Sequence, residues 1–229
     1  MEIQRESMEY DVVIVGAGPA GLATSIKLKQ INPDLNVCIL EKGSEVGAHI
    51  LSGNVFETRA LDELIPDWKE KGAPIKTKVK KEKFLFLGKK SSLSWPTWLL
   101  PSVQKNHKNY IISLANLCRW LAEQAEGLGV EIFPGFAASK IIYDGDDKII
   151  GVQTGDMGID KEGNKKDSFE PGLNIMAKVT VFSEGCRGHL GKEVIKKYKL
   201  DNNKSPQQYG IGFKEIWEIP EDQHDEGLV

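Results

Sequence analysis

The stretch Asp11-Val12-Val13-Ile14-Val15-Gly16-Ala17-Gly18-Pro19-Ala20-Gly21-Leu22-Ala23 decides the fold of this chain. Its β-branched run is typical of a buried parallel strand that stops at Gly16. Gly16, Gly18 and Gly21 then form G-x-G-x-x-G in front of a helical pattern, which predicts a strand-to-helix turn. In such a turn Gly16 permits the tight bend, Gly18 lets the backbone approach a pyrophosphate, and Gly21 lets the helix pack on the strand. The helix N-terminus offers free N–H groups to the phosphates.

A second apolar run, Asn36-Val37-Cys38-Ile39-Leu40, predicts the next strand and ends at Glu41, 20 residues beyond Gly21. A carboxylate at this spacing can accept hydrogen bonds from the ribose hydroxyls of an adenine dinucleotide. The alternative is a structural glycine turn in an unrelated α/β fold, with Glu41 a solvated charge at a strand end. We favour a dinucleotide site, because strand, glycines, helix, second strand and acid all fall at the expected spacing.

Length and composition exclude several classes of protein. The 229 residues suffice for one large or two small domains, and the net charge of −3 argues against nucleic acid as a partner. No run of about 18 apolar residues predicts a transmembrane helix, and the acidic, polar start resembles neither a signal peptide nor an Arg-rich transit peptide. We expect residues 1–9 to be a loose leader.

Cys38, Cys118 and Cys186 are far apart, which predicts reduced, packed thiols.

Two segments allow more than one interpretation. Residues 42–54 contain three glycines and start at the carboxyl end of a predicted strand, where ligands gather. They form either a loop close to a flat cofactor ring or a surface loop with an exposed His49. Residues 84–101 combine two tryptophans, several leucines and two prolines with lysines. This composition suits a membrane–water interface, and the alternative is a proline-rich loop packed over its own core.

The remaining patterns predict further elements. Residues 58–65 predict a short helix closed by Pro66, 113–129 an amphipathic helix, 130–134 a strand, 140–154 a hairpin, 156–174 a polar loop, 175–182 a strand and 209–219 an alternating strand. Lys76, Lys78 and Lys80 would share one solvated strand face.

Arg119 is either a solvated charge or a contact to the dinucleotide phosphates. Glu184 and Gly185 follow a strand, and we expect them at the same end of the sheet as Gly16.

Several unusual runs occur along the chain, namely residues 40–53 (LEKGSEVGAHILSG), 109–111 (NYI), 155–159 (GDMGI), 184–190 (EGCRGHL) and 209–217 (YGIGFKEIW). These runs resemble the electron-transfer flavoprotein–ubiquinone oxidoreductases, within the flavoprotein class that includes aromatic hydroxylases. The similarity extends from about Ser7 to the last residue. The resemblance implies FAD rather than NAD, in a membrane-surface enzyme that passes electrons from reduced electron-transfer flavoprotein to ubiquinone.

The resemblance also assigns residues to the cofactor and to the membrane. It places around FAD the positions Gly16, Gly18, Pro19, Ala20, Gly21, Glu41, Lys42, Gly47, Ser52, Gly53, Arg119, Glu184 and Gly185. The loop from Gly47 to Gly53 would lie towards the flavin ring, and Phe84 to Pro101 would form the quinone and membrane region. The implied location is peripheral, on the inner face of the bacterial inner membrane or the matrix side of the mitochondrial one. No catalytic side chain is expected, because the flavin carries the redox chemistry.

One departure concerns the [4Fe–4S] cluster that the family requires. Such a cluster is usually held by four thiolates, and this chain has three scattered ones. We expect the cluster ligands outside this chain, which would be the N-terminal portion of a longer enzyme. The expected fold class is α/β, a Rossmann-like FAD-binding fold with a parallel sheet, a β-hairpin insertion and part of a mixed α+β quinone-binding domain. The expected segments are 1–75 and 105–200 for FAD binding, with the insertion at 136–174, then 76–104 for quinone and membrane contact and 201–229 for the start of a substrate domain.

Three other functions stay open at this point. Another flavin enzyme of the same fold, such as a hydroxylase or an isoprenoid-lipid reductase, would be favoured by a requirement for NADPH. A catalytically inert FAD-binding or assembly fragment would bind flavin without turnover. An NAD dehydrogenase would carry no yellow chromophore.

Overall fold

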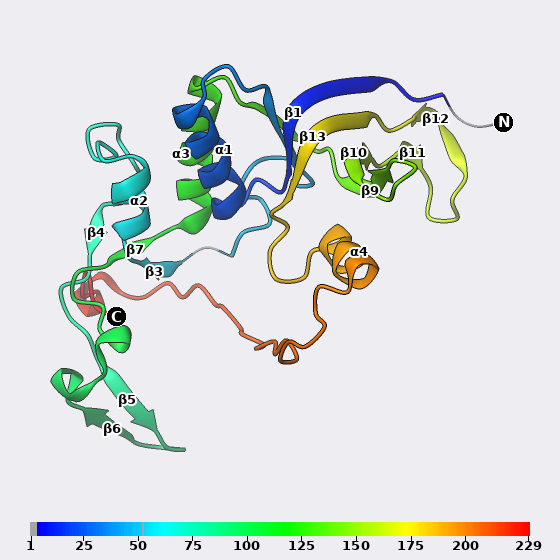
Figure 1. Cartoon of the computed structure of the whole chain (residues 1–229). Helices are drawn as coiled ribbons and strands as arrows, with labels where there is room; N and C mark the ends of the chain where they lie inside the picture. The colour runs from blue at the N-terminus through cyan, green and yellow to red at the C-terminus, as the bar shows by residue number, and fades with distance from the viewer. Residues whose placement is uncertain (1–3, 52) are drawn as a thin grey trace. The chain divides into compact units, whose positions relative to one another are not determined.

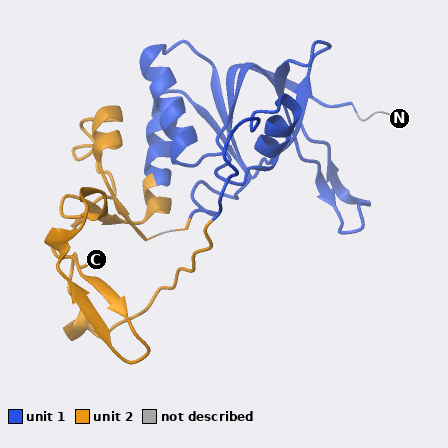
Figure 2. Ribbon diagram, turned by 60° about the horizontal axis from the view of Figure 1, so that its bottom comes forward, with its two compact units in different colours: residues 1–50, 118–209 blue, residues 51–117, 210–229 orange. Residues whose placement is uncertain are grey.

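The computed structural model describes residues 4–51 and 53–229. The chain divides into two compact units (Figure 2). Unit 1 comprises Met1–Ile50 and Cys118–Tyr209, and unit 2 comprises Leu51–Leu117 and Gly210–Val229. Each unit is thus assembled from two separate stretches of the sequence.

A six-stranded sheet forms the centre of unit 1, in the order β8-β2-β1-β13-β10-β9 (Figure 1). The four parallel strands are β8 (Glu131–Pro134), β2 (Val37–Glu41), β1 (Ser7–Val15) and β13 (Asn174–Phe182). The antiparallel pair β10 (Ile149–Thr154) and β9 (Ala138–Tyr143) continues the sheet beside β13. The predicted α/β class, with a parallel sheet and a hairpin, is confirmed. The predicted leader is too long, because β1 already begins at Ser7, where it pairs with Asn174 of β13.

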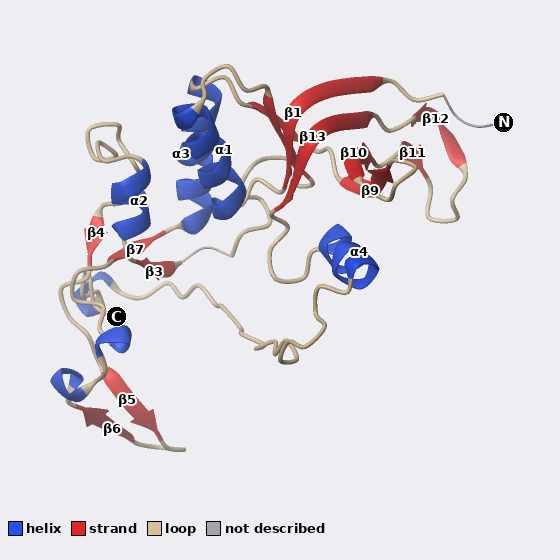
Figure 3. Cartoon of the chain, in the orientation of Figure 1, coloured by secondary structure: helices blue, strands red, loops and turns tan. Residues whose placement is uncertain are grey.

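The side chains of β1 alternate between the two faces of the sheet and so divide the core of unit 1. Val13 and Val15 belong to the cluster that contains Leu190 of α4 (His189–Tyr198). Figure 3 shows α4 apart from the other helices of unit 1. Ile14 points the other way, towards Gly21 of α1 (Pro19–Ile31). The helix α3 (Leu114–Gly127), which belongs to unit 1 from Cys118 onward, lies beside α1 (Figure 1). A parallel strand that is covered on both faces needs the near-continuous apolar run seen in its sequence.

The helix α1 begins and ends with residues suited to those positions. Pro19 occupies its first turn, where its fixed φ suits a helix and its missing N–H leaves no donor unpaired. At the other end, the buried Lys29 donates from Nζ to the carbonyl oxygens of Pro33 and Leu35 at 2.5 and 3.0 Å. A lysine in the last turn also complements the negative end of the helix dipole. These bonds stabilise the connection between α1 and β2.

The predicted polar loop over residues 156–174 is wrong, because this segment forms the hairpin β11 (Met157–Ile159) and β12 (Lys165–Glu170). Its turn is organised by Asp160, whose Oδ1 accepts the backbone N–H groups of Glu162 and Asn164 at 3.0 and 2.7 Å. Most side chains of β12 are exposed, so the sequence has no alternating apolar pattern that would predict this strand.

Unit 2 contains a small antiparallel sheet in the order β3-β7-β4, formed by β3 (Asn54–Phe56), β7 (Tyr110–Ile112) and β4 (Thr77–Lys78). The predicted short helix is confirmed as α2 (Arg59–Leu64). The unit also carries the hairpin β5 (Phe84–Leu87) and β6 (Ser92–Trp95) and three 3-10 turns, η1 (Thr97–Leu99), η2 (Ser102–Gln104) and η3 (Glu221–Gln223). Among the described residues of the whole chain, no helix has the length and apolarity needed to cross a bilayer.

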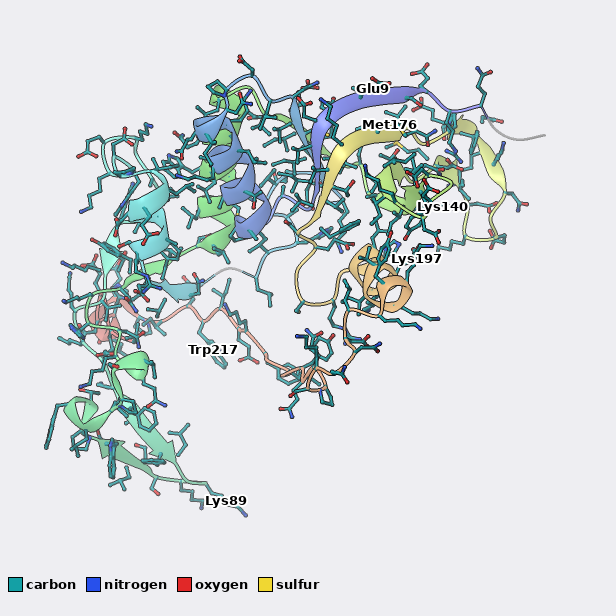
Figure 4. The ribbon with its side chains drawn as sticks, in the orientation of Figure 1. Glu9, Lys89, Lys140, Met176, Lys197 and Trp217 are labelled. Carbon is teal, nitrogen blue, oxygen red and sulfur yellow. The ribbon has the colours of Figure 1, made fainter. Side chains whose placement is uncertain are left out.

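The predicted strand over residues 209–219 is wrong for this structure. The segment runs without regular secondary structure, and its apolar side chains are exposed, with Phe213 at 92% and Ile216 at 101%. Trp217 also lies on this segment and is exposed (Figure 4). The alternating pattern describes side chains that fit a strand, but a strand also needs a neighbour for its backbone hydrogen bonds.

Candidate functional site

Three parallel strands of unit 1 end together at one edge of the sheet. The N–H of Gly16 donates to the carbonyl oxygen of Leu40 at 2.8 Å, and the N–H of Ser183 donates to that of Val15 at 2.8 Å. These bonds hold the ends of β1, β2 and β13 in register. The prediction that Glu184 and Gly185 lie at the same end of the sheet as Gly16 is therefore confirmed. Open parallel sheets bind their ligands at this edge, beside the strand where the chain order reverses.

The glycines of the turn differ in what surrounds them. Gly16 has φ +104°, and an added Cβ would lie 2.6 Å from the carbonyl oxygen of Ser183. A Cβ on Gly21 would lie 2.1 Å from the carbonyl oxygen of Gly16, so only glycine lets α1 approach β1 this closely. Gly18 is the exception, because its added Cβ would meet nothing within 4 Å. Space over the backbone at Gly18 is what a bound pyrophosphate requires.

The first turn of α1 faces this open space. Pro19 and Ala20 are exposed, and the first N–H groups of a helix have no acceptor within the helix. Together with the positive end of the helix dipole, these donors suit an anion.

Glu41 links the glycine turn to the loop that follows β2. Its Oε2 accepts the N–H of Ala17 at 2.9 Å, and its Oε1 accepts the N–H of Gly43 at 2.7 Å. A carboxylate offers about four lone-pair sites, so both oxygens keep capacity for ribose hydroxyls. The backbone contact with Ala17 was not predicted from the sequence. It fixes the carboxylate at the edge of the sheet before any ligand binds.

The loop after β2 brings Arg119 to the same edge. The Nη2 of Arg119, on α3, donates to Oε1 of Glu45 at 2.7 Å. The side chain of Arg119 is 41% and that of Glu45 62% exposed, so this ion pair contributes little to stability and leaves the guanidinium within reach of solvent. Lys42 is exposed, and Gly47 is buried with φ +89°. The role of Glu45 as a partner of Arg119 was missed by sequence reasoning, since the two residues are 74 positions apart.

Three further positions of the loop after β2 were singled out from the sequence. Ser52 lies outside the described residues. Gly53 belongs to unit 2, has φ +79°, and its carbonyl oxygen accepts a hydrogen bond from Nζ of Lys214 at 2.6 Å. His49 is exposed, as one of the two interpretations of this loop predicted.

Glu184 has a structural contact that the sequence did not indicate. Its Oε1 accepts the N–H groups of His189 and Leu190 at 3.0 and 3.2 Å, and its Oε2 accepts that of Gly191 at 2.7 Å. These three donors belong to the first turn of α4, so the carboxylate caps this helix. Gly188 leaves room for it, because an added Cβ would lie 2.5 Å from that of Glu184. Gly185, with φ +79°, stays exposed beside the cap.

The three cysteines differ in their surroundings. Cys38 and Cys118 are buried, as predicted, and burial raises the pKa of each thiol to about 12. Cys186 is exposed, so the prediction of a packed thiol is wrong there. Within the described part of the chain, no group of three or more His, Cys, Asp or Glu side chains could hold a metal ion.

Comparison with known proteins shows close relatives along the whole chain. The probable electron transfer flavoprotein-ubiquinone oxidoreductase of Acinetobacter baylyi is 55% identical over 99% of this chain and 41% of its own length. The mitochondrial electron transfer flavoprotein-ubiquinone oxidoreductase of Arabidopsis thaliana is 53% identical over 100% of this chain and 36% of its own length. The chain thus spans about two fifths of the length of these relatives.

Two more distant comparisons concern the fold. A family model described as the Thi4 family matches residues 1–63, which contain the glycine turn and Glu41. The structure of the flavin-dependent brominase Bmp2 superimposes with a TM-score of 0.54 at 20% identity, over 82% of this chain and 41% of that one. Unit 1 therefore has the Rossmann-like fold of known flavoproteins.

Proposed function

We propose that this chain, which is homologous over its whole length to the electron transfer flavoprotein-ubiquinone oxidoreductases, forms the FAD-binding part of an oxidoreductase that passes electrons from reduced electron-transfer flavoprotein to ubiquinone. The observation that carries this proposal is the identity of 53–55% over 99–100% of the chain. Identity at this level, over nearly the whole of this chain, supports a shared cofactor and a shared reaction.

The carboxyl edge of the unit 1 sheet fits FAD. Gly18 leaves space for the pyrophosphate, with Pro19, Ala20 and Gly21 at the N-terminus of α1 next to it. Glu41, already oriented by the N–H groups of Ala17 and Gly43, accepts the ribose hydroxyls. When bound, the flavin supplies the one- and two-electron redox chemistry. The residues of this chain bind and orient it.

The other positions proposed to contact FAD act from the loops of that edge. Arg119 neutralises phosphate charge, and Glu45 holds its guanidinium at the edge of the sheet. Glu184 acts indirectly, because its carboxylate is committed to the cap of α4 and thereby fixes Gly185. Lys42, Gly47, Ser52 and Gly53 complete the proposed set, the last three on the loop assigned to the flavin ring.

We assign the [4Fe–4S] cluster of the proposed electron path to residues outside this chain. A cluster of this type is usually held by four thiolates. Burial of Cys38 and Cys118 raises their pKa values, which disfavours the thiolate form that binds iron. The one exposed cysteine, Cys186, supplies at most a single ligand.

We assign quinone and membrane contact to residues 76–104 of unit 2. This segment exposes large apolar side chains on a two-stranded hairpin and the two 3-10 turns after it, including Leu87 at 80% and Trp98 at 74%. Exposed apolar patches of this kind mark interaction sites, and tryptophan suits a membrane–water interface. The proposed location is peripheral, on the inner face of the bacterial inner membrane or the matrix side of the mitochondrial one.

An absorption spectrum of the purified chain, with the released chromophore identified by mass, tests the cofactor. We expect a flavin spectrum and FAD at close to one per chain. Reduction by electron-transfer flavoprotein and oxidation by a water-soluble ubiquinone analogue would then test the partners in the full-length protein. A folded chain that takes up NAD but no FAD would contradict the proposal, and reduction by NADPH would favour another flavin enzyme of the same fold.

A pair of glycine variants tests the site. Gly18→Ala adds a methyl group where nothing lies within 4 Å, so the fold is kept while the approach of the pyrophosphate is blocked. Gly145→Ala is the matched control, since its added Cβ also meets nothing within 4 Å and it lies in the β9–β10 turn. We expect Gly18→Ala to weaken FAD binding at least tenfold in a fluorescence titration and Gly145→Ala to leave it unchanged. Equal affinities for both variants would place the cofactor elsewhere.

A further inference from the structure

The hairpin of unit 2 exposes apolar side chains on both of its faces. Phe84 pairs with Trp95 and Phe86 with Leu93, which places these four side chains on one face. Phe86 makes edge-to-face contacts with both Phe84 and Trp95, at ring-centroid distances of 5.4 and 6.0 Å. Leu85 and Leu87 project from the opposite face and are 44% and 80% exposed. A two-stranded hairpin with so little cover is marginally stable in water, so a partner surface would stabilise it.

The charge of this region is strongly one-sided. From Lys83 to Lys108 the sequence contains five lysines and no Asp or Glu, although the whole chain has a net charge of −3. Lys89 and Lys90 occupy the turn between β5 and β6, and Figure 4 shows Lys89 at the tip of the hairpin. Neither lysine forms an ion pair with another of the described residues. Lys105 donates to the carbonyl oxygen of Trp98 at 3.1 Å, a neutral acceptor that leaves its positive charge uncompensated.

Two of the three acidic side chains at the base of the hairpin are paired with other lysines. Asp225 pairs with Lys81 at 2.8 Å, and Glu226 pairs with Lys80. Glu82 accepts the backbone N–H of Asn106 at 2.5 Å and keeps its negative charge, which offsets one positive charge. Residues 83–108, which we call the hairpin surface, therefore carry a net positive charge from five lysines that these neighbours do not cancel.

We propose that the hairpin surface selects anionic lipid headgroups, with Lys89 and Lys90 contacting the headgroups while the apolar side chains enter the interface. This inference rests on the proposed membrane contact and adds the class of lipid. An anionic bilayer fits both features, because it offers negative charge at its surface and an apolar layer directly below it. Nucleic acid or an acidic protein surface would meet the lysines but would leave side chains such as Leu87 and Val103, 80% and 92% exposed, without an apolar environment.

Vesicle binding of the FAD-loaded full chain tests the proposal. We compare vesicles of phosphatidylcholine alone with vesicles that also contain phosphatidylglycerol, at low and high salt. Binding should be stronger to the anionic vesicles, and salt should reduce the difference. Each lysine near an anionic surface contributes about fivefold in affinity, so K89Q/K90Q should bind anionic vesicles roughly 25-fold more weakly. The same variant should bind phosphatidylcholine vesicles as the parent chain does.

A matched control is available on the other exposed hairpin. K161Q/K166Q removes two exposed lysines from the β11–β12 region of unit 1 and changes the net charge equally. Its anionic-vesicle affinity should stay within about twofold of the parent chain's, since these lysines lie outside the hairpin surface. Equal losses in both variants, or equal binding to both kinds of vesicle, would overturn lipid selectivity.

The two levels of the proposal fail in different ways. Absence of binding to any vesicle, with FAD content unchanged, would overturn membrane contact and lipid selectivity together. Loss of electron-transfer flavoprotein binding in K89Q/K90Q, with vesicle binding retained, would assign the lysines to an acidic protein instead. Vesicle selectivity in a chain that fails to bind FAD would support the lipid inference while contradicting the proposed function.

Discussion

The carboxyl edge of the unit 1 sheet and the hairpin surface of unit 2 are constrained in opposite ways. At the edge, neighbouring backbone groups dictate which residue fits, as at Gly21, whose added Cβ would lie 2.1 Å from a carbonyl oxygen. On the hairpin surface, large apolar residues such as Val103 are 92% exposed and touch little of their own chain. Residues of the first kind are required by the fold. Residues of the second kind contribute little to the fold. Their apolar character therefore indicates a surface that binds a partner.

The largest effect is expected at Gly21. Gly21→Ala would force α1 away from β1, because the new Cβ would lie 2.1 Å from the carbonyl oxygen of Gly16 and 3.2 Å from Cγ2 of Ile14. Overpacking of this kind destabilises by about 3 kcal/mol. Chemical denaturation of the variant should show this loss, whereas Gly18→Ala, in open space, should stay within about 0.5 kcal/mol of the parent chain. Similar losses at both glycines would show that the two positions are equally constrained.

The cap of α4 provides the next largest effect. Glu184→Ala removes the acceptor of three backbone N–H groups in the first turn of this helix. Loss of a helix cap costs about 1–2 kcal/mol. Hydrogen exchange should show faster exchange of the amides of His189, Leu190 and Gly191, with the β1 amides little affected. Weaker FAD binding without faster exchange would instead make Glu184 a direct cofactor ligand.

Among the described residues, the β11–β12 hairpin differs from the β5–β6 hairpin in having a partly buried ion pair at its base. The β11–β12 hairpin is tied to the start of β1 through Arg5, whose guanidinium donates to both oxygens of Asp156 and to the carbonyl oxygen of Gly172. The hydrogen bond from Arg5 and the N–H of Gly172 lower the pKa of the Asp156 carboxyl from 3.8 to about 2. The carboxylate therefore stabilises the fold above pH 3.8, and this contribution is lost as the pH falls towards 2.

The free energy of unfolding, measured over a series of pH values, gives the contribution of the Arg5–Asp156 ion pair. Asp156→Asn should lower the free energy of unfolding by about 1 kcal/mol at neutral pH, as expected for a partly exposed pair. The difference from the parent chain should shrink as the pH falls from about 4 to about 2, where Asp156 becomes protonated. The Arg5→Gln variant should give a similar loss, and combining the two changes should add little more. Fully additive losses would mean that the two side chains act independently.

The contrast between the regions also explains what the sequence could predict. The β1–α1–β2 unit was predictable, because strand, glycines, helix and Glu41 lie close together in the sequence. Each of these patterns reflects a structural requirement that neighbouring residues impose. The cap by Glu184 was not predictable, since the N–H groups that donate to its carboxylate lie five to seven residues ahead and only the folded turn brings them to it. The contact of Arg119 with Glu45 depends on tertiary structure in the same way.

Two errors over strands have a common origin. The β11–β12 hairpin was missed because its side chains are mostly exposed and polar, so no apolar alternation marks it. Residues 209–219 show the opposite, with good alternation and no strand, because alternation describes side chains and says nothing of the neighbour that a strand requires. The composition of residues 84–101 allowed two interpretations, an interface and a loop packed over its own core, and only the family resemblance favoured the interface. The exposure of their large apolar side chains argues against the packed loop.

The smallest expected effect lies on the hairpin surface. Val103→Ser should change the free energy of unfolding by no more than about 0.5 kcal/mol, because the side chain is 92% exposed and buries little area on folding. Val13→Ser is the matched control in the β1 core, where the same change leaves an unpaired hydroxyl in a fully buried site and should cost about 2 kcal/mol or more. A loss at Val103 as large as that at Val13 would mean that the hairpin surface is covered by the protein itself. The effects on vesicle affinity should have the opposite order. Val103→Ser should weaken vesicle binding more than Val13→Ser, since Val103 lies on the surface proposed to enter the lipid and Val13 does not.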